Sequence, residues 1–144
     1  MIGALNDCFA AECRSLIGHL ADSQPFISWV AVDEQAVVRR IIADERRHER
    51  ELADLIDALD GVAVPVTPPT NAASIHYLDL LYLLSQIIAD KRRLVAAYEM
   101  ACARVAGEER AEKLVSRILD DERRHLADLE RIARSNAPAA APTA

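Results

Sequence analysis

The chain has 144 residues, a length at which a single domain is expected. Only 4 residues are glycine and 51% are hydrophobic, a composition that favours helices over sheets and supplies a sizeable core. The formal net charge of −6 and the lack of a long basic run argue against a nucleic-acid-binding surface, whereas an acidic excess suits a protein that binds cations.

Cysteine usage and hydropathy indicate a cytoplasmic protein. There are 3 cysteines, Cys8, Cys13 and Cys102. An odd number without a Cys-x-x-Cys spacing fits reduced thiols better than a disulfide framework, a rubredoxin-type site or a zinc ribbon. The N-terminal segment has no basic region and is interrupted by Asp7, so it does not resemble a signal peptide. The most apolar stretch, residues 75–89, contains His76 and Asp79, which indicates a buried helix and not a membrane span.

Four helical segments are expected from the hydrophobic period and from the helix-breaking residues. They cover about residues 2–22, 33–60, 75–105 and 108–135. Ser74 is placed to cap the third segment, and Gly61 and Gly107 are placed to end the second and third. Residues 136–144 are rich in alanine and proline and lack core-forming residues, so we expect one domain over residues 1–135 followed by a disordered tail.

The pentapeptide Asp-Glu-Arg-Arg-His occurs twice, at residues 44–48 and 121–125, a separation of 77 residues (121 less 44). Residues three apart on a helix lie on one face about one turn from each other, so Glu45 with His48, and Glu122 with His125, can each bind a metal ion. One Glu-x-x-His pair alone would more often be an exposed helix surface. Two pairs set among matching apolar residues favour a metal site.

Each Glu-x-x-His helix is preceded by a helix that carries a candidate carboxylate ligand. Glu12 and the four residues after it align with Asp90 and its followers at an offset of 78 (90 less 12). At a rise of about 1.5 Å per residue, Glu12 and Glu45 lie at similar depth below the first turn, as do Asp90 and Glu122 below the other. The sequence therefore predicts two repeated helical hairpins whose ligands meet in one layer.

The connection between the second and third helices, residues 60–74, is longer than an antiparallel pair needs and contains three prolines. Fifteen extended residues span about 50 Å, which is enough to carry the chain back along the bundle. We predict such a long crossover, with an ordinary up-down-up-down bundle as the alternative topology.

These residues together resemble the ferritin-like di-iron carboxylate superfamily, nearest in layout to its rubrerythrin and bacterioferritin branch. The resemblance covers about residues 2–135 and implies an all-α, ferritin-like four-helix bundle. It implies two iron ions, or manganese or a mixed pair. The implied metal ligands are Glu12, Glu45, His48, Asp90, Glu122 and His125, of which Glu45 and Glu122 bridge the two ions.

The resemblance also assigns Asp44 and Asp121, which would each accept the N–H of the ligand histidine on the opposite helix. The alternative for both is a solvent-exposed charge. Asp90 departs from the family pattern, in which glutamate is usual, and its shorter side chain would leave the second metal position weaker or more open. Glu99 is nine residues further on and is expected on the opposite side of the helix, which makes it a poor substitute.

The activity implied is that of an oxidoreductase reacting with dioxygen or hydrogen peroxide, as a ferroxidase or a rubrerythrin-like peroxidase. The fold also hosts hydroxylases. Because the chain has no Cys-x-x-Cys electron-transfer motif, its reductant would be an external electron donor. The alternative is a non-catalytic bundle that binds or stores iron, or whose metal is structural. A homodimer or higher homo-oligomer is expected, without nucleic-acid or membrane partners.

Overall fold

In the computed structural model, residues 1–20, 31–66 and 80–137 are described. They form the helices α1 (Ile2–Cys13), α2 (Leu16–Leu20), α3 (Val32–Ala58), α4 (Leu80–Arg104) and α5 (Glu109–Ser135). The expected cap Ser74 and residues 138–144 of the expected tail lie outside the described ranges. None of the described helices combines the length and the apolar character that a membrane crossing requires.

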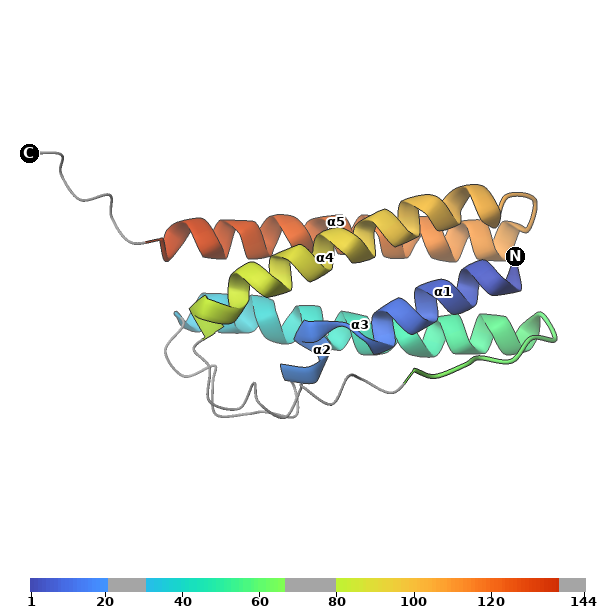
Figure 1. The fold of residues 1–144 in the computed structure, drawn as a ribbon, viewed down its shortest axis with the longest axis horizontal. Helices are drawn as coiled ribbons and strands as arrows, with labels where there is room; N and C mark the ends of the chain where they lie inside the picture. Colours follow the sequence, from blue (N-terminus) through green and yellow to red (C-terminus); the bar gives the residue numbers. More distant parts are fainter. Residues whose placement is uncertain (21–30, 67–79, 138–144) are drawn as a thin grey trace, which may run out of the picture.

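The long helices form a four-helix bundle with a crossover (Figure 1). α3 and α4 both begin at one end of the bundle, whereas α1 and α5 both begin at the other end. The chain between α3 and α4 must therefore return along the whole bundle, which confirms the crossover and excludes the up-down-up-down alternative. Its first part is held against α1, because the Asn6 amide donates to the Val62 carbonyl at 3.0 Å and accepts from the Val64 N–H at 2.9 Å.

The first expected helix is interrupted, so that α1 and the short α2 replace one continuous element. The backbone N–H of Leu16 donates to Oδ2 of Asp90 at 2.9 Å, and the Ser15 hydroxyl donates to Oε1 of Glu45 at 2.8 Å. Side chains from α3 and α4 thus satisfy groups at the break. The expectation of one helix over residues 2–22 was wrong because these partners are distant in the sequence.

Helix ends elsewhere follow local rules. α3 closes with a C-terminal motif in which the Gly61 N–H donates to the Ile56 carbonyl at 2.8 Å and Asp60 takes a φ of 57°. Glu108 caps the start of α5, where its carboxylate accepts the Ala111 N–H at 2.6 Å. Both ends lie within two residues of those expected from the sequence.

The apolar core is divided into two clusters by a polar layer. One cluster includes Leu5, Leu52 and Ile118, and the other includes Ile17, Ile41 and Leu129. Along each long helix, buried polar residues lie between the residues of the two clusters. The bundle therefore surrounds its centre with apolar packing above and below, which leaves polar groups there away from water.

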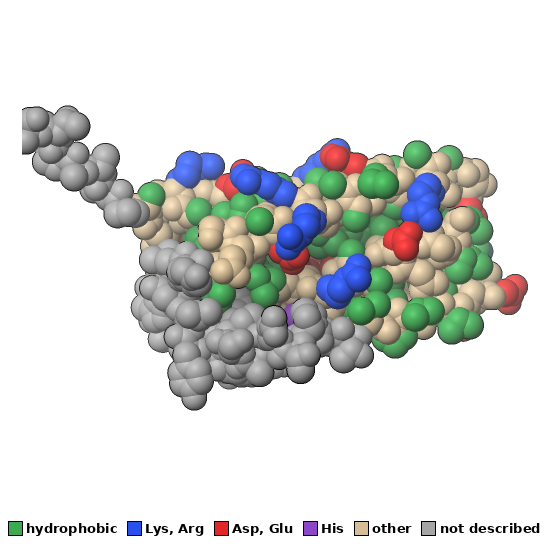
Figure 2. All heavy atoms as spheres, viewed as in Figure 1, with side chains coloured by type: hydrophobic (Ala, Val, Ile, Leu, Met, Phe, Trp, Pro, Cys, Tyr) green, Lys and Arg blue, Asp and Glu red, His purple; other side chains and the backbone are tan. Residues whose placement is uncertain are grey.

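On the face shown in Figure 2, acidic and basic side chains are interspersed among apolar ones. Exposed ion pairs cross between helices, as where Arg104 of α4 contacts Asp7 of α1 at 2.6 Å. Pairs of this kind contribute about 0–1 kcal/mol each. Packing of the two apolar clusters, and not surface charge, therefore holds the helices together.

Candidate metal centre

The layer gathers buried polar side chains from four helices. They are Glu12 from α1, Glu45 and His48 from α3, Lys91 from α4, and Glu122 and His125 from α5. None of them is more than 2% exposed. Five of the six ligands expected from the sequence are thus brought together, and on α4 the inward side chain is Lys91.

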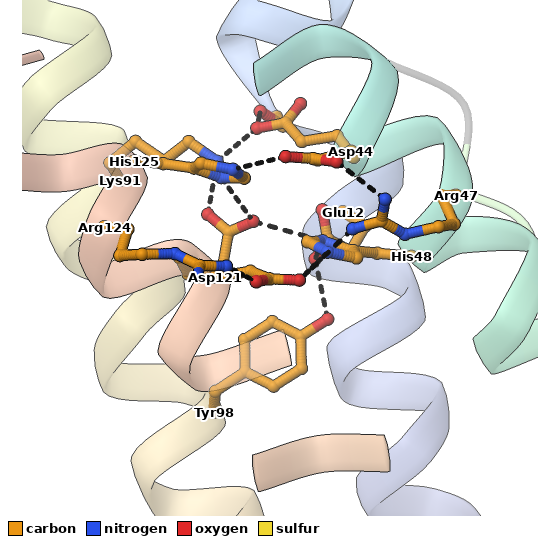
Figure 3. A network of polar contacts seen from close by, with 12 residues as sticks. Glu12, Asp44, Arg47, His48, Lys91, Tyr98, Asp121, Arg124 and His125 are labelled. Carbon is orange, nitrogen blue, oxygen red and sulfur yellow. Dashed lines mark hydrogen bonds and ion pairs between the residues drawn. The ribbon is translucent and has the colours of Figure 1, made fainter. Parts of the chain in front are cut away.

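Three donor atoms converge on one point of this layer (Figure 3). Nδ1 of His48 lies 3.3 Å from Oε1 of Glu12 and 3.2 Å from Oε1 of Glu122. All three side chains are at most 1% exposed, and the donor atoms lie within 4.8 Å of one another. Neighbouring ligand atoms bound at about 2.0–2.2 Å to one metal ion are separated by roughly 3 Å, which matches these distances.

The far nitrogen of each histidine pairs with an aspartate from the opposite helix. Nε2 of His48 lies 3.2 Å from Oδ2 of Asp121, and Nε2 of His125 lies 3.0 Å from Oδ2 of Asp44. Arg47 contacts both aspartates, at 2.8 Å from Asp44 and 3.2 Å from Asp121. These contacts fix the orientation of the two rings and hold the N–H on Nε2.

The two rings differ in their inner nitrogens. Nδ1 of His125 forms a hydrogen bond with Oε1 of Glu122 at 3.2 Å. Nδ1 of His48 is buried without a hydrogen-bond partner, although it faces two carboxylate oxygens. A ring nitrogen that faces two negatively charged oxygens is stabilised by a cation between them, either a proton on the nitrogen or a metal ion. The residues therefore fit a metal ion at Glu12, His48 and Glu122.

The pKa values reflect the strong negative potential of the layer. Burial alone would lower the pKa of His48, but Glu12 and Glu122 outweigh it and raise this pKa to about 9. Burial opposes the ionised form of Glu122, but the neighbouring rings of His125 and His48 and the charge of Lys91 hold its pKa well below the usual range. Cations are therefore favoured at this point of the bundle.

Lys91 donates to Oε1 of Glu45 and to Oε2 of Glu122. Burial would lower the pKa of Lys91, but these carboxylates outweigh it and place the pKa above its usual range. Burial raises the pKa of Glu45 to about 8, reinforced by Glu12 and opposed by Lys91. The buried carboxylates thus outnumber the fixed cations, which leaves the layer able to accept a positive ion.

A solvent-open cavity of about 270 Å³ reaches one side of the layer, lined by Glu12, Ser15, Gly18, His19, Glu45 and Glu49 among others. Oε2 of Glu12 and Oε2 of Glu45 are buried without hydrogen-bond partners. Gly18 leaves the space for Glu45, because a Cβ there would lie 3.1 Å from Oε2. Small molecules and ions thus have a route to these carboxylates.

Tyr98 and Lys91 are the centre residues that sequence reasoning missed. The Tyr98 hydroxyl donates to Oε1 of Glu12 at 2.7 Å, and burial together with Glu12 raises the pKa of Tyr98 well above its usual value. Both residues lie on the buried stripe of α4, in which Ile87, Lys91, Leu94 and Tyr98 follow at intervals of three or four. This spacing of buried residues was the feature of the sequence from which Lys91 and Tyr98 could have been assigned to the centre.

Asp90 lies beside this stripe and does not join the centre. Its Oδ2 accepts the Leu16 N–H, and its Oδ1 accepts from Arg93 at 3.0 Å. Glu99 is half exposed and pairs with Arg123 at 2.8 Å, on the outer side of α4 as expected. Asp90 was predicted as a ligand from its residue type. In the structure, its carboxylate instead contacts the break between α1 and α2.

Among solved structures, the chain is similar to a protein from Bacteroides fragilis described as a dodecameric thioferritin and a bacterioferritin-related protein. The TM-score is 0.73 at 22% sequence identity, over 93% of this chain and 84% of the other. No protein-family model and no curated protein matches the chain. Together with the crossover bundle, the structural match shows that the chain has the ferritin-like fold.

Proposed function

We propose that this protein binds a redox-active transition metal, iron or manganese, at Glu12, His48 and Glu122, and acts as an oxidoreductase on hydrogen peroxide or dioxygen. The observation that carries the proposal is the buried, unpaired Nδ1 of His48 between two carboxylate oxygens. Carboxylate and imidazole donors without a thiolate suit iron or manganese.

When bound, the metal supplies the electron-transfer chemistry that the side chains lack. The protein's part is to position its donors and to keep the surroundings dry. Asp121 orients His48, and the Tyr98 hydroxyl fixes one oxygen of Glu12. The two apolar clusters exclude bulk water from above and below. The cavity beside Glu12 and Glu45 gives a small oxidant access from the remaining side.

The proposal also covers the electron donor and the oligomeric state. Since the chain carries no Cys-x-x-Cys motif, electrons come from an external donor. The similar Bacteroides fragilis protein is described as a dodecamer, and a homo-oligomer is therefore proposed here.

Non-catalytic iron binding is the second candidate, and the position of Lys91 favours it. Lys91 contacts both Glu45 and Glu122, so these carboxylates are already joined by a cation. Reduction of peroxide to water takes two electrons, whereas one ferrous ion going to ferric supplies one. A centre with a single iron therefore needs its external donor within each turnover, or else it only binds the ion.

Stopped-flow absorbance separates these functions. Anaerobic protein loaded with ferrous iron is mixed with hydrogen peroxide or with dioxygen, and iron oxidation is followed. The oxidoreductase proposal expects oxidation at least tenfold faster than for free ferrous iron, with the acceleration lost in His48→Ala. Oxidation no faster than that of free iron, in protein shown to contain bound iron, would leave the binding function in its place.

A further inference from the structure

We propose that the ammonium group of Lys91 takes the place of a second metal ion, so that the centre holds one metal ion and one fixed organic cation. The inference rests on the proposed function, because it presupposes a metal ion at Glu12, His48 and Glu122. It concerns how many ions the centre holds.

The contacts of Lys91 are those of a bridging cation. Its Nζ donates to Oε1 of Glu45 on α3 and to Oε2 of Glu122 on α5, and the side chain is 1% exposed. Glu122 directs its other oxygen, Oε1, at Nδ1 of His48. One carboxylate is thus shared between the Lys91 ammonium and the candidate metal position, as a bridging carboxylate is shared between two cations.

The two histidines differ in how their inner nitrogens meet Glu122, although both nitrogens lie 3.2 Å from its Oε1. His48 has a free inner nitrogen at the candidate metal position, since its Nδ1 has no hydrogen-bond partner. His125 is the corresponding residue of the second repeat, but both of its nitrogens are engaged, Nδ1 with Glu122 and Nε2 with Asp44. The second position therefore lacks an available imidazole nitrogen.

Charge balance supports one divalent ion. Counted as ionised, the three carboxylates of Glu12, Glu45 and Glu122 carry three negative charges, and Lys91 neutralises one of them. One divalent ion neutralises the remaining two, whereas a second ion would leave a buried excess of positive charge. Replacing Lys91 with glutamate changes the charge of the layer by minus two, which matches one additional divalent ion.

The test is a manganese titration of the metal-free, full-length protein, with free Mn²⁺ counted by electron paramagnetic resonance. Wild type is expected to bind one ion per chain with the spectrum of an isolated ion. Lys91→Glu is expected to bind one ion more, with a spectrum that shows coupling between the two. Lys113→Glu makes the same charge change at a lysine that is 74% exposed, and it should leave the count unchanged.

The outcomes separate this inference from the proposed function. Two coupled ions in wild type, or no gain in folded Lys91→Glu, would overturn the role of Lys91. Wild type that binds no ion would instead contradict the proposed metal function, and with it the ion that this inference presupposes. Should Lys91→Glu fail to fold by circular dichroism, the wild-type count and spectrum decide: one isolated ion supports the inference, and two coupled ions overturn it.

Discussion

His48 and His125 occupy the same place in the repeated pentapeptide, yet their inner nitrogens have different surroundings. Nδ1 of His48 faces Glu12 and Glu122 without a hydrogen bond, whereas Nδ1 of His125 is bonded to Glu122. A sequence repeat gives both residues the same prediction. The structure adds Lys91, which donates to Oε2 of Glu122 and has no counterpart in the repeated pentapeptide.

Loss of the His48 imidazole should weaken metal binding far more than loss of an exposed carboxylate. Removing only a partner of a metal ligand typically costs about 10–100-fold in affinity, so His48→Ala should cost more than roughly 100-fold. Glu99→Ala is the matched control, because Glu99 is half exposed and pairs with Arg123. Isothermal titration with Mn²⁺ measures both. A comparable loss in Glu99→Ala would show that the ion binds elsewhere.

Cysteine reactivity offers a separate test at the scale of single residues. Cys8 is buried, and burial together with the charges of Glu12 and Asp7 raises its pKa to about 12. A raised thiol pKa keeps the unreactive neutral form at pH 8.5, because the thiolate fraction grows only as the pH approaches that pKa. In native protein, iodoacetamide should therefore modify Cys8 far more slowly than the partly exposed Cys13 and Cys102. Peptide mass spectrometry measures this, and equal labelling of the three thiols would contradict the burial of Cys8.

Residues of the buried centre could be predicted from the sequence where residue type and helix register agreed. At Glu45 and His48, the residue type suits a metal and the position falls on the apolar stripe of its helix. On α4 the two signals conflict: Asp90 has the expected chemistry, and Lys91 has the inward register. The prediction chose Asp90 by residue type. In the structure Lys91 points inward, because it lies on the apolar stripe through Ile87 and Leu94 that packs α4 against the bundle.

At the scale of elements, helix ends set by local residues were predictable and those set by distant partners were not. α3 ends at its Gly61 motif and α5 begins after the cap Glu108, both close to the expected places. The break between α1 and α2 depends on Asp90 and Glu45, which are distant in the sequence from Ser15 and Leu16. Helix propensity at residues 14–15 carries no sign of it.

The end of α3 gives a prediction about stability. A Cβ on Gly61 would lie 2.9 Å from Cγ2 of Ile56 and 3.0 Å from the Ile56 carbonyl oxygen. Since the backbone oxygen cannot move aside easily, Gly61→Ala should lower the free energy of unfolding by about 1–3 kcal/mol. Gly3→Ala is the opposite control. Gly3 lies within α1, and the nearest atom to an added Cβ, Nη2 of Arg104, is 3.8 Å away, so the change should raise stability by roughly 0.5–1 kcal/mol. Urea unfolding measures both, and a neutral or stabilising Gly61→Ala would contradict the described packing.

At the scale of the whole molecule, the fold class and the crossover were predictable from helix count and connection length. Four long segments with helical hydrophobic periodicity, joined by one long proline-containing connection, are compatible with few bundle topologies. That α4 contributes Lys91 to the centre was not predictable in this way, because it depends on how α4 packs in a layer built by four helices.

A metal-binding centre at the middle of the bundle should stabilise the whole fold. An ion that binds only the folded state adds about 2.7 kcal/mol at a free concentration 100 times its dissociation constant. Calorimetry should therefore show a higher melting temperature when Mn²⁺ is added to metal-free wild type, and no rise in His48→Ala. An equal rise in both proteins would place the stabilising ion outside the centre.

The most direct test of the central claim is anomalous diffraction from crystals of wild type grown with Mn²⁺, recorded on both sides of the manganese edge. The account predicts one strong anomalous peak per chain between Nδ1 of His48, Oε1 of Glu12 and Oε1 of Glu122, with Lys91 still in contact with Glu45 and Glu122. No peak at that position in a folded, manganese-exposed crystal would contradict it.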